Sequence, residues 1–215
     1  ATLVAMPADR IHLVRHGEVL NPDHVVYAAL PGYGLSDQGT SQAAAAANRL
    51  AHAPVTRIVC SPLERARQTA APIAAGRDVP VVLDDRMTEW ALAERWSGER
   101  WDDLPSQRPG ELEAYLEHPE DLAFTEEPLE MLARRTAAAV TAHAALTDGG
   151  DLVVISHQDP IEAARRRLTG RGFDRFHEGK PDHATIVTLE PDDETFVEKG
   201  VWTPDQGAPF PPLPS

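Results

Sequence analysis

The sequence predicts an α/β fold, a three-layer α/β/α sandwich with a mostly parallel central sheet and an inserted helical cap. Short apolar runs alternate with helical patterns along the chain, which is typical of βαβ units. Polar residues directly follow three of these runs, and such positions form the ligand-binding edge of open α/β sheets. Because 215 residues can build one sizeable core, we expect a single domain over 1–215.

Five apolar runs are interpreted as buried strands: Ile11–Val14, Arg57–Cys60, Val79–Leu83, Asp151–Ile155 and Thr185–Leu189. A weaker sixth strand is expected over Thr195–Val201. The lone cysteine, Cys60, ends the second run, so an intrachain disulfide is excluded and a small core residue is expected.

Helical patterns lie between the strands. An alanine-rich helix is expected over Asp37–Leu50 with Ser36 as N-cap, and a second over Leu129–Leu146. Ser61-Pro62-Leu63-Glu64 has the pattern of a capping box, and Asp159-Pro160-Ile161-Glu162 repeats it with aspartate at the N-cap. These two helices are expected to begin one or two residues after a strand, with N-termini that favour an anion at the sheet edge.

Residues 90–126 interrupt this alternation and are interpreted as a cap over the sheet edge. They contain three of the four tryptophans and ten acidic residues, against three basic residues, Arg95, Arg100 and Arg108. Residues 203–215 carry five prolines and are expected to form an extended or disordered tail. Residues 1–8 are expected to be a loose N-terminus and not a signal peptide.

The net charge of −14 disfavours nucleic acid and anionic membranes as partners. It also means that any anion-binding site must be a local concentration of arginine. Because no apolar stretch is long enough to span a bilayer, we expect a cytoplasmic protein.

Arg15-His16-Gly17 follows the first strand, Ser61 to Thr69 the second, and Ser156-His157 the fourth. These residues suit a phosphate monoester, whose transfer needs in-line placement and charge neutralisation. Arginine binds phosphate oxygens in pairs, and Gly17 lets the backbone come close.

In this interpretation Arg15 and Arg65 bind the phosphate, and His157 donates to one of its oxygens. A neutral His16 attacks phosphorus and forms a phosphohistidine. The leaving alkoxide needs a proton, and Glu89, which enters the cap, is the candidate acid. No metal or other cofactor is expected, because the arginines and the histidine supply the positive charge.

Simpler interpretations stand beside this one. His16 and His157 are each compatible with a structural role, Arg65 with a solvated helix face, and Glu89 with an exposed acid. Two histidines also suggest a metal site, although no second carboxylate or cysteine falls at ligand spacing. The combination favours catalysis, because each residue lies at a strand-to-helix junction of one topology.

Several strings resemble signatures of the histidine phosphatase superfamily, the phosphoglycerate mutase-like proteins: Leu13-Val14-Arg15-His16-Gly17-Glu18, Leu35-Ser36-Asp37-Gln38-Gly39, Ser61-Pro62-Leu63-Glu64-Arg65-Ala66-Arg67-Gln68-Thr69-Ala70, Arg86-Met87-Thr88-Glu89 and Val154-Ile155-Ser156-His157. The resemblance covers most of the chain. It implies His16 as nucleophile, Glu89 as proton donor, and a phosphate pocket of Arg15, Arg65 and His157.

The chain departs from this family at two positions. Gln158 stands where the family usually has glycine after the second histidine, so its side chain is expected to contact or crowd the substrate. Asn21 lies five residues past His16, where the family often has asparagine six past, and it is a candidate phosphate ligand. Glu18 and Val19 after the glycine distinguish the chain from the acid phosphatase and phytase branch.

The acidic cap favours a phosphatase that acts on a small monophosphate ester, because a mutase must hold a phosphorylated acid with extra basic residues. Phosphoglycerate mutase-type transfer is the first alternative, and a non-catalytic phospholigand-binding module is the second. The expected partners are a small phosphorylated substrate and, at most, a second copy of the chain in a homodimer.

Overall fold

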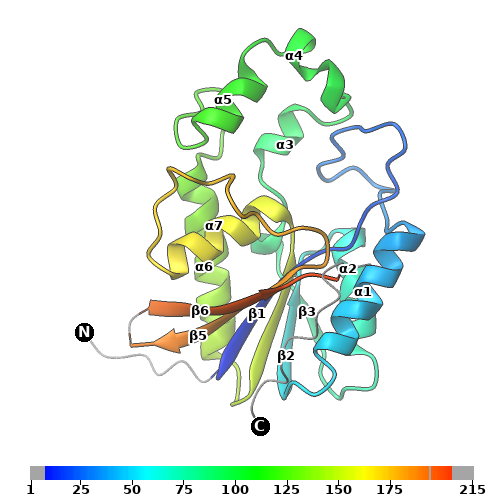
Figure 1. Ribbon diagram of the computed structural model, residues 1–215, viewed down its shortest axis with the longest axis vertical. Coiled ribbons are helices and arrows are strands. Elements are labelled where there is room, and N and C mark those ends of the chain that lie inside the picture. The colour runs from blue at the N-terminus through cyan, green and yellow to red at the C-terminus, as the bar shows by residue number, and fades with distance from the viewer. Residues whose placement is uncertain (1–7, 194, 205–215) are drawn as a thin grey trace.

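The central sheet has six strands in the order β3-β2-β4-β1-β5-β6 (Figure 1). The computed structural model describes residues 8–193 and 195–204, so most of the expected tail and of the expected loose N-terminus lie outside it. The strands are β1 (Arg10–Arg15), β2 (Val55–Cys60), β3 (Val81–Leu83), β4 (Asp151–Ser156), β5 (Ile186–Asp192) and β6 (Thr195–Trp202). Strands β1 to β4 pair in parallel, whereas β5 and β6 are antiparallel, which confirms the predicted mostly parallel α/β fold.

Helices cover both faces of this sheet (Figure 1). One face packs against α1 (Asp37–Arg49) and α2 (Glu64–Ala74), and the other against α6 (Leu129–Ala145) and α7 (Gln158–Leu168). Alternate strand residues point to opposite faces: Val154 packs with the α6 and α7 side, and Val153 with the α1 and α2 side. The central strands are buried on both faces, which explains their almost continuously apolar sequences. The prediction of a buried strand is wrong for β3, where Val81 and Leu83 are exposed, because β3 is the last strand of the sheet in the strand order.

Two expected helix starts are wrong. Helix α2 begins at Glu64 with Leu63 as N-cap, because the Ser61 hydroxyl is hydrogen-bonded to His157 and the chain stays extended at Leu63. Helix α7 begins one residue before Asp159, with His157 as N-cap, so the Asp159 carboxylate lies in the first turn and binds Tyr115 instead. By contrast, Ser36 caps α1 as expected and accepts a hydrogen bond from Gly39 N.

The segment 90–126 forms short helices that lie beyond the carboxyl ends of the strands (Figure 1). They are α3 (Leu92–Arg95), the 3₁₀ turn η2 (Trp101–Asp103), α4 (Leu104–Gln107) and α5 (Glu111–Glu117), and a further 3₁₀ turn, η1 (Asp85–Met87), precedes them. An apolar cluster around Trp90, Trp96 and Tyr115 holds this cap and joins it to Phe176 beyond α7. Of the helices that the structure describes, none is long and apolar enough to cross a membrane.

Candidate active site

The register of the sheet brings the predicted histidines together. Arg15 of β1 pairs with Ser156 of β4, so His16 and His157 follow at the same edge. Their ring centroids are 5.2 Å apart. Ser61 leaves the neighbouring strand β2 at this level and donates its main-chain N–H to Ile155 O at 2.9 Å. Three strand ends thus build one polar surface inside the protein.

His16 is held as a neutral imidazole with one nitrogen available as a nucleophile. Its Nδ1 lies 2.7 Å from the carbonyl of Gly17, which only accepts, so Nδ1 carries the proton. Its Nε2 accepts a hydrogen bond from Nε of Arg65 at 3.3 Å. Burial, followed by the charges of its neighbours, holds the pKa of His16 well below its usual value. The ring therefore stays unprotonated at neutral pH.

Two arginines flank this imidazole. Arg65 is only 1% exposed, and its Nη2 donates to Ala28 O at 2.9 Å, which excludes a solvated helix face. Arg15 donates from Nη1 to Pro181 O at 3.0 Å and from Nη2 to His183 at 3.1 Å. Its buried Nε finds no hydrogen-bond partner among the described residues. A buried donor without a partner is costly, and such a group commonly serves a ligand.

His157 presents a second unpaired nitrogen. Its Nε2 lies 2.8 Å from Oγ of Ser61, and that hydroxyl also accepts from Leu63 N. Its Nδ1 is buried and unpaired within the described part of the chain. Burial and the nearby arginines lower the pKa of His157, so this ring is neutral as well. We refer to Arg15, His16, Arg65 and His157 as the cradle.

Gly17 allows the chain to turn directly after the nucleophile. A Cβ at this position would collide with the carbonyl of Gly39 in α1. The Gly17 N–H donates to Oγ1 of Thr69 at 3.0 Å, so it is occupied by α2. Gly17 thus acts through close packing, and its N–H is not free for a ligand in this conformation.

Glu89 lines the same cavity as Arg15 and His16. One carboxylate oxygen accepts the main-chain N–H of Trp90 at 2.9 Å. Burial, with the Asp159 carboxylate as the next cause, raises the pKa of Glu89 to about 7. A substantial fraction of Glu89 is therefore protonated near neutral pH, as a proton donor requires.

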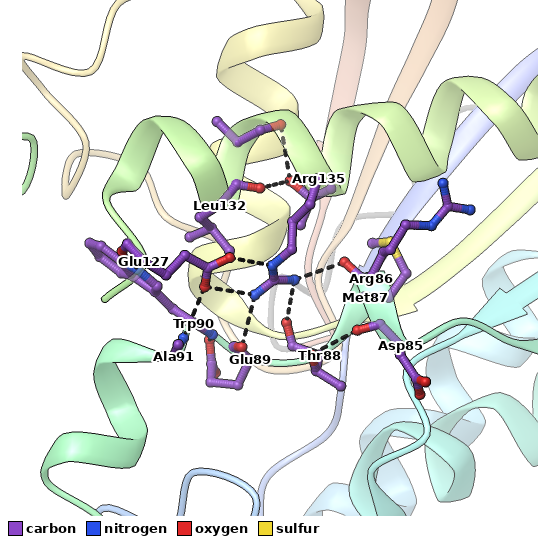
Figure 2. A network of polar contacts seen from close by, with 12 residues as sticks. Asp85, Arg86, Met87, Thr88, Glu89, Trp90, Ala91, Glu127, Leu132 and Arg135 are labelled. Carbon is purple, nitrogen blue, oxygen red and sulfur yellow. Dashed lines mark hydrogen bonds and ion pairs between the residues drawn. The ribbon is translucent and has the colours of Figure 1, made fainter. Parts of the chain in front are cut away.

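A half-buried network fixes the loop that carries Glu89 (Figure 2). From α6, Arg135 donates to the carbonyls of Arg86 at 2.8 Å, Thr88 at 3.0 Å and Glu89 at 3.0 Å. The same guanidinium is paired with the Glu127 carboxylate, which also accepts Ala91 N at 3.0 Å. A single side chain thus binds three carbonyl groups within the segment 86–89.

Asn21 and Gln158 were predicted to contact the phosphate or the rest of the substrate, and both line the cavity. The Asn21 amide is hydrogen-bonded to the main chain of Val25 through both Nδ2 (2.9 Å) and Oδ1 (3.1 Å), so it closes a turn at the edge of the cavity. The Gln158 amide donates to Pro181 O at 3.1 Å. It therefore contacts the same carbonyl as Arg15.

Sequence reasoning missed His183 and Tyr27. His183 accepts from Arg15, and its ring centroid lies 5.8 Å from that of His16. The Tyr27 ring lies beneath the guanidinium of Arg65 at 4.7 Å, a cation–π contact. Both residues lie in loops outside the strand ends, and no spacing pattern points to either.

These groups together have the chemistry to bind an anion, to act as a nucleophile and to donate a proton. The cavity has a volume of about 290 Å³. Among the residues that the structure describes, no group of three or more histidine, cysteine or acidic side chains is arranged to hold a metal ion. Cys60 is fully buried, with a thiol pKa raised to about 12 by burial, in agreement with its expected core role.

Comparisons with known proteins identify relatives of this chain. The sequence model of the histidine phosphatase superfamily (branch 1) matches residues 11–202. An uncharacterized protein of Mycobacterium tuberculosis, Rv0525, is 38% identical over 77% of this chain and 82% of its own length. The adenosylcobalamin/alpha-ribazole phosphatase of Salmonella typhimurium is 30% identical over 74% of this chain and 79% of its own.

Solved structures share the fold at lower identity. A putative alpha-ribazole-5'-P phosphatase from Escherichia coli superposes with a TM-score of 0.79 at 21% identity, covering 94% of this chain and all of its own. Mycobacterial glucosyl-3-phosphoglycerate phosphatase superposes with a TM-score of 0.78 at 24% identity, covering 90% and 98% of the two chains. At these identities the likeness concerns the fold alone.

Proposed function

Because this chain belongs to the histidine phosphatase superfamily (branch 1), we propose that it hydrolyses a small phosphate monoester through a phosphohistidine on His16, without a metal ion. One observation carries the proposal. Two buried, unpaired nitrogens, Nε of Arg15 and Nδ1 of His157, lie in the cradle around the neutral His16 imidazole. In the proposed reaction Ser61 donates to Nε2 of His157, so that Nδ1 carries the proton offered to the phosphate. Relatives named as phosphatases, such as the Salmonella typhimurium protein, support the reaction class.

In the proposed reaction the phosphate enters the cradle and takes the guanidinium of Arg65 away from Nε2 of His16. Arg15 neutralises charge on the remaining oxygens, and the neutral His157 donates a hydrogen bond to one of them. The freed lone pair of Nε2 attacks phosphorus, the N–P bond forms and the ester P–O bond breaks. These preorganised donors stabilise the charge of this transition state.

Glu89 completes the cycle as acid and then base. Its carboxylic acid gives a proton to the leaving alkoxide, and the alcohol departs. The resulting carboxylate then takes a proton from water, which attacks the phosphohistidine and releases phosphate. A pKa raised to about 7 suits both steps near neutral pH.

The proposal is tested by following phosphate release from p-nitrophenyl phosphate and small alkyl phosphates, with conversion of 3-phosphoglycerate to 2-phosphoglycerate measured in parallel. We expect net phosphate release that EDTA does not change. Isomer conversion without net release would instead identify a mutase. Thermal stabilisation by phosphate with no product from any ester would identify a binding module, and strong inhibition by EDTA would identify a metal requirement.

A further inference from the structure

We propose that the alcohol part of the substrate is an uncharged, apolar group about the size of one aromatic ring, bound against Trp101, Leu92 and Val26. This inference rests on the proposed function, and it concerns the walls of the cavity beyond the cradle. These walls contain both apolar side chains and carboxylates.

The arginines of the cap are turned away from the cavity. Arg95 makes a two-pronged ion pair with Glu111, at 2.6 and 2.8 Å, and Arg108 pairs with Glu99 at 2.6 Å. The exposed Arg100 lies beside two aspartates of η2. None of the three lines the cavity. The cap therefore offers no cation, among the described residues, to a second anionic group of a substrate.

The charges that do line the cavity are mostly negative. Arg15 is the single arginine or lysine among the described lining residues, and the cradle assigns it to the phosphate. The carboxylates of Glu18 and Asp159 line the same space, together with Glu89, which is protonated in the proposed active form. The nearest lysine, Lys180, is bound to Asp159 and donates to the Tyr115 hydroxyl at 3.0 Å. A carboxylate on the alcohol part would meet like charges and find no free partner.

Trp101 lines the cavity with a partly exposed aromatic ring. Its exposed fraction is 39%, which is high for such a large apolar side chain. The ring contacts Trp96 edge-to-face at a centroid distance of 6.0 Å. Leu92, Ala93 and Val26 continue the apolar surface. An apolar wall with a few polar groups at one end is the usual form of a site for an uncharged small molecule.

The backbone fixes this wall in place. Val26 N donates to Glu99 O at 2.8 Å, Gly98 N to Val26 O at 2.9 Å, and Trp101 N to His24 O at 2.9 Å. The loop after β1 and the cap are thus joined by main-chain hydrogen bonds, so the wall exists before a ligand binds. A cavity of about 150 Å³ holds one benzene ring, so the volume of about 290 Å³ accommodates a phosphate and one ring.

The test compares kcat/KM for benzyl phosphate, phosphoserine, 3-phosphoglycerate and methyl phosphate. We expect benzyl phosphate to exceed both carboxylate-bearing esters by about tenfold or more, the scale of a group fitted to an apolar pocket. Trp101→Ala is expected to lower kcat/KM for benzyl phosphate by about tenfold, mainly through KM, and for methyl phosphate by less than about twofold. The control is Leu116→Ala, an exposed cap residue that does not line the cavity.

Equal use of 3-phosphoglycerate and benzyl phosphate would overturn the inference, as would an equal effect of Trp101→Ala on benzyl and methyl phosphate. If no ester releases phosphate, the proposed function fails, and the inference is tested by binding alone. Titration calorimetry with benzylphosphonate and phosphonoacetate then decides it. Tighter binding of benzylphosphonate supports the apolar site, and equal or weaker binding refutes it.

Discussion

Arg15 and His16 of the cradle line the same cavity as Glu89, but the cradle and the loop that carries Glu89 are fixed by different means. His16 and His157 extend directly from adjacent central strands, so the register of β1 and β4 sets their separation. Glu89 lies six residues beyond β3, on a loop whose carbonyls bind one arginine of α6 (Figure 2). The position of His16 thus depends on strand register, whereas the position of Glu89 depends on the hydrogen bonds of the Arg135 side chain.

The largest effect is expected from His16→Ala, because it removes the atom that attacks phosphorus. We expect turnover of every ester to fall by roughly 10⁴-fold or more, as for loss of a covalent nucleophile. Phosphate release under saturating substrate measures it, with circular dichroism to confirm folding. His118→Ala, an exposed histidine of the cap, is the matched control. Substantial remaining activity in folded His16→Ala would remove His16 from its assigned role.

Glu89→Gln is expected to have the second-largest effect, and the size of the effect should depend on the leaving group of the ester. Esters with poor leaving groups, such as methyl phosphate, should slow by about 10²-fold to 10⁴-fold, the scale of general acid catalysis. p-Nitrophenyl phosphate should slow much less, because its leaving group needs no proton. Equal slowing of the two esters would reject Glu89 as the acid.

The pH profile checks the same assignment. The pKa of Glu89 is raised to about 7, whereas that of His16 is held well below its usual value. The active form has Glu89 protonated and His16 neutral, so kcat for methyl phosphate should fall as pH rises through about 7. In Glu89→Gln this decline should disappear.

Arg135→Lys tests whether the side chain of α6 positions the acid. Lysine keeps the charge but lacks the planar fork that reaches three carbonyls. We expect kcat for methyl phosphate to fall by about tenfold to a hundredfold, as for a misplaced catalytic group, with a smaller loss on p-nitrophenyl phosphate. The exposed neighbour Arg134→Lys is the control. A purely structural role would lower both rates equally.

The same contrast separates what the sequence could predict from what it could not. Arg15, His16 and His157 were predictable because an apolar run ends in them and parallel strands end at one edge. The roles of Arg135 and Glu127 were not, because they bind main-chain groups of distant residues, and carbonyls leave no sequence signal. Ser61 was assigned to a helix cap because its local pattern fits one, but the tertiary contact with His157 replaces that local bond.

The smallest effect is expected from Gln158→Gly, which restores the residue that the family usually has. The Gln158 amide donates to Pro181 O, a carbonyl that Arg15 also binds, so its removal leaves that loop held by Arg15. Glycine in the first turn of α7 should cost about 1 kcal/mol of folding free energy. We expect kcat/KM to change by less than about threefold, the scale of one neutral hydrogen bond. A loss of kcat/KM above tenfold in steady-state assays would instead indicate that the Gln158 side chain contacts the substrate. The start of α7 would then resemble the loop of Glu89, because a side chain, and not strand register alone, would determine its part in the site.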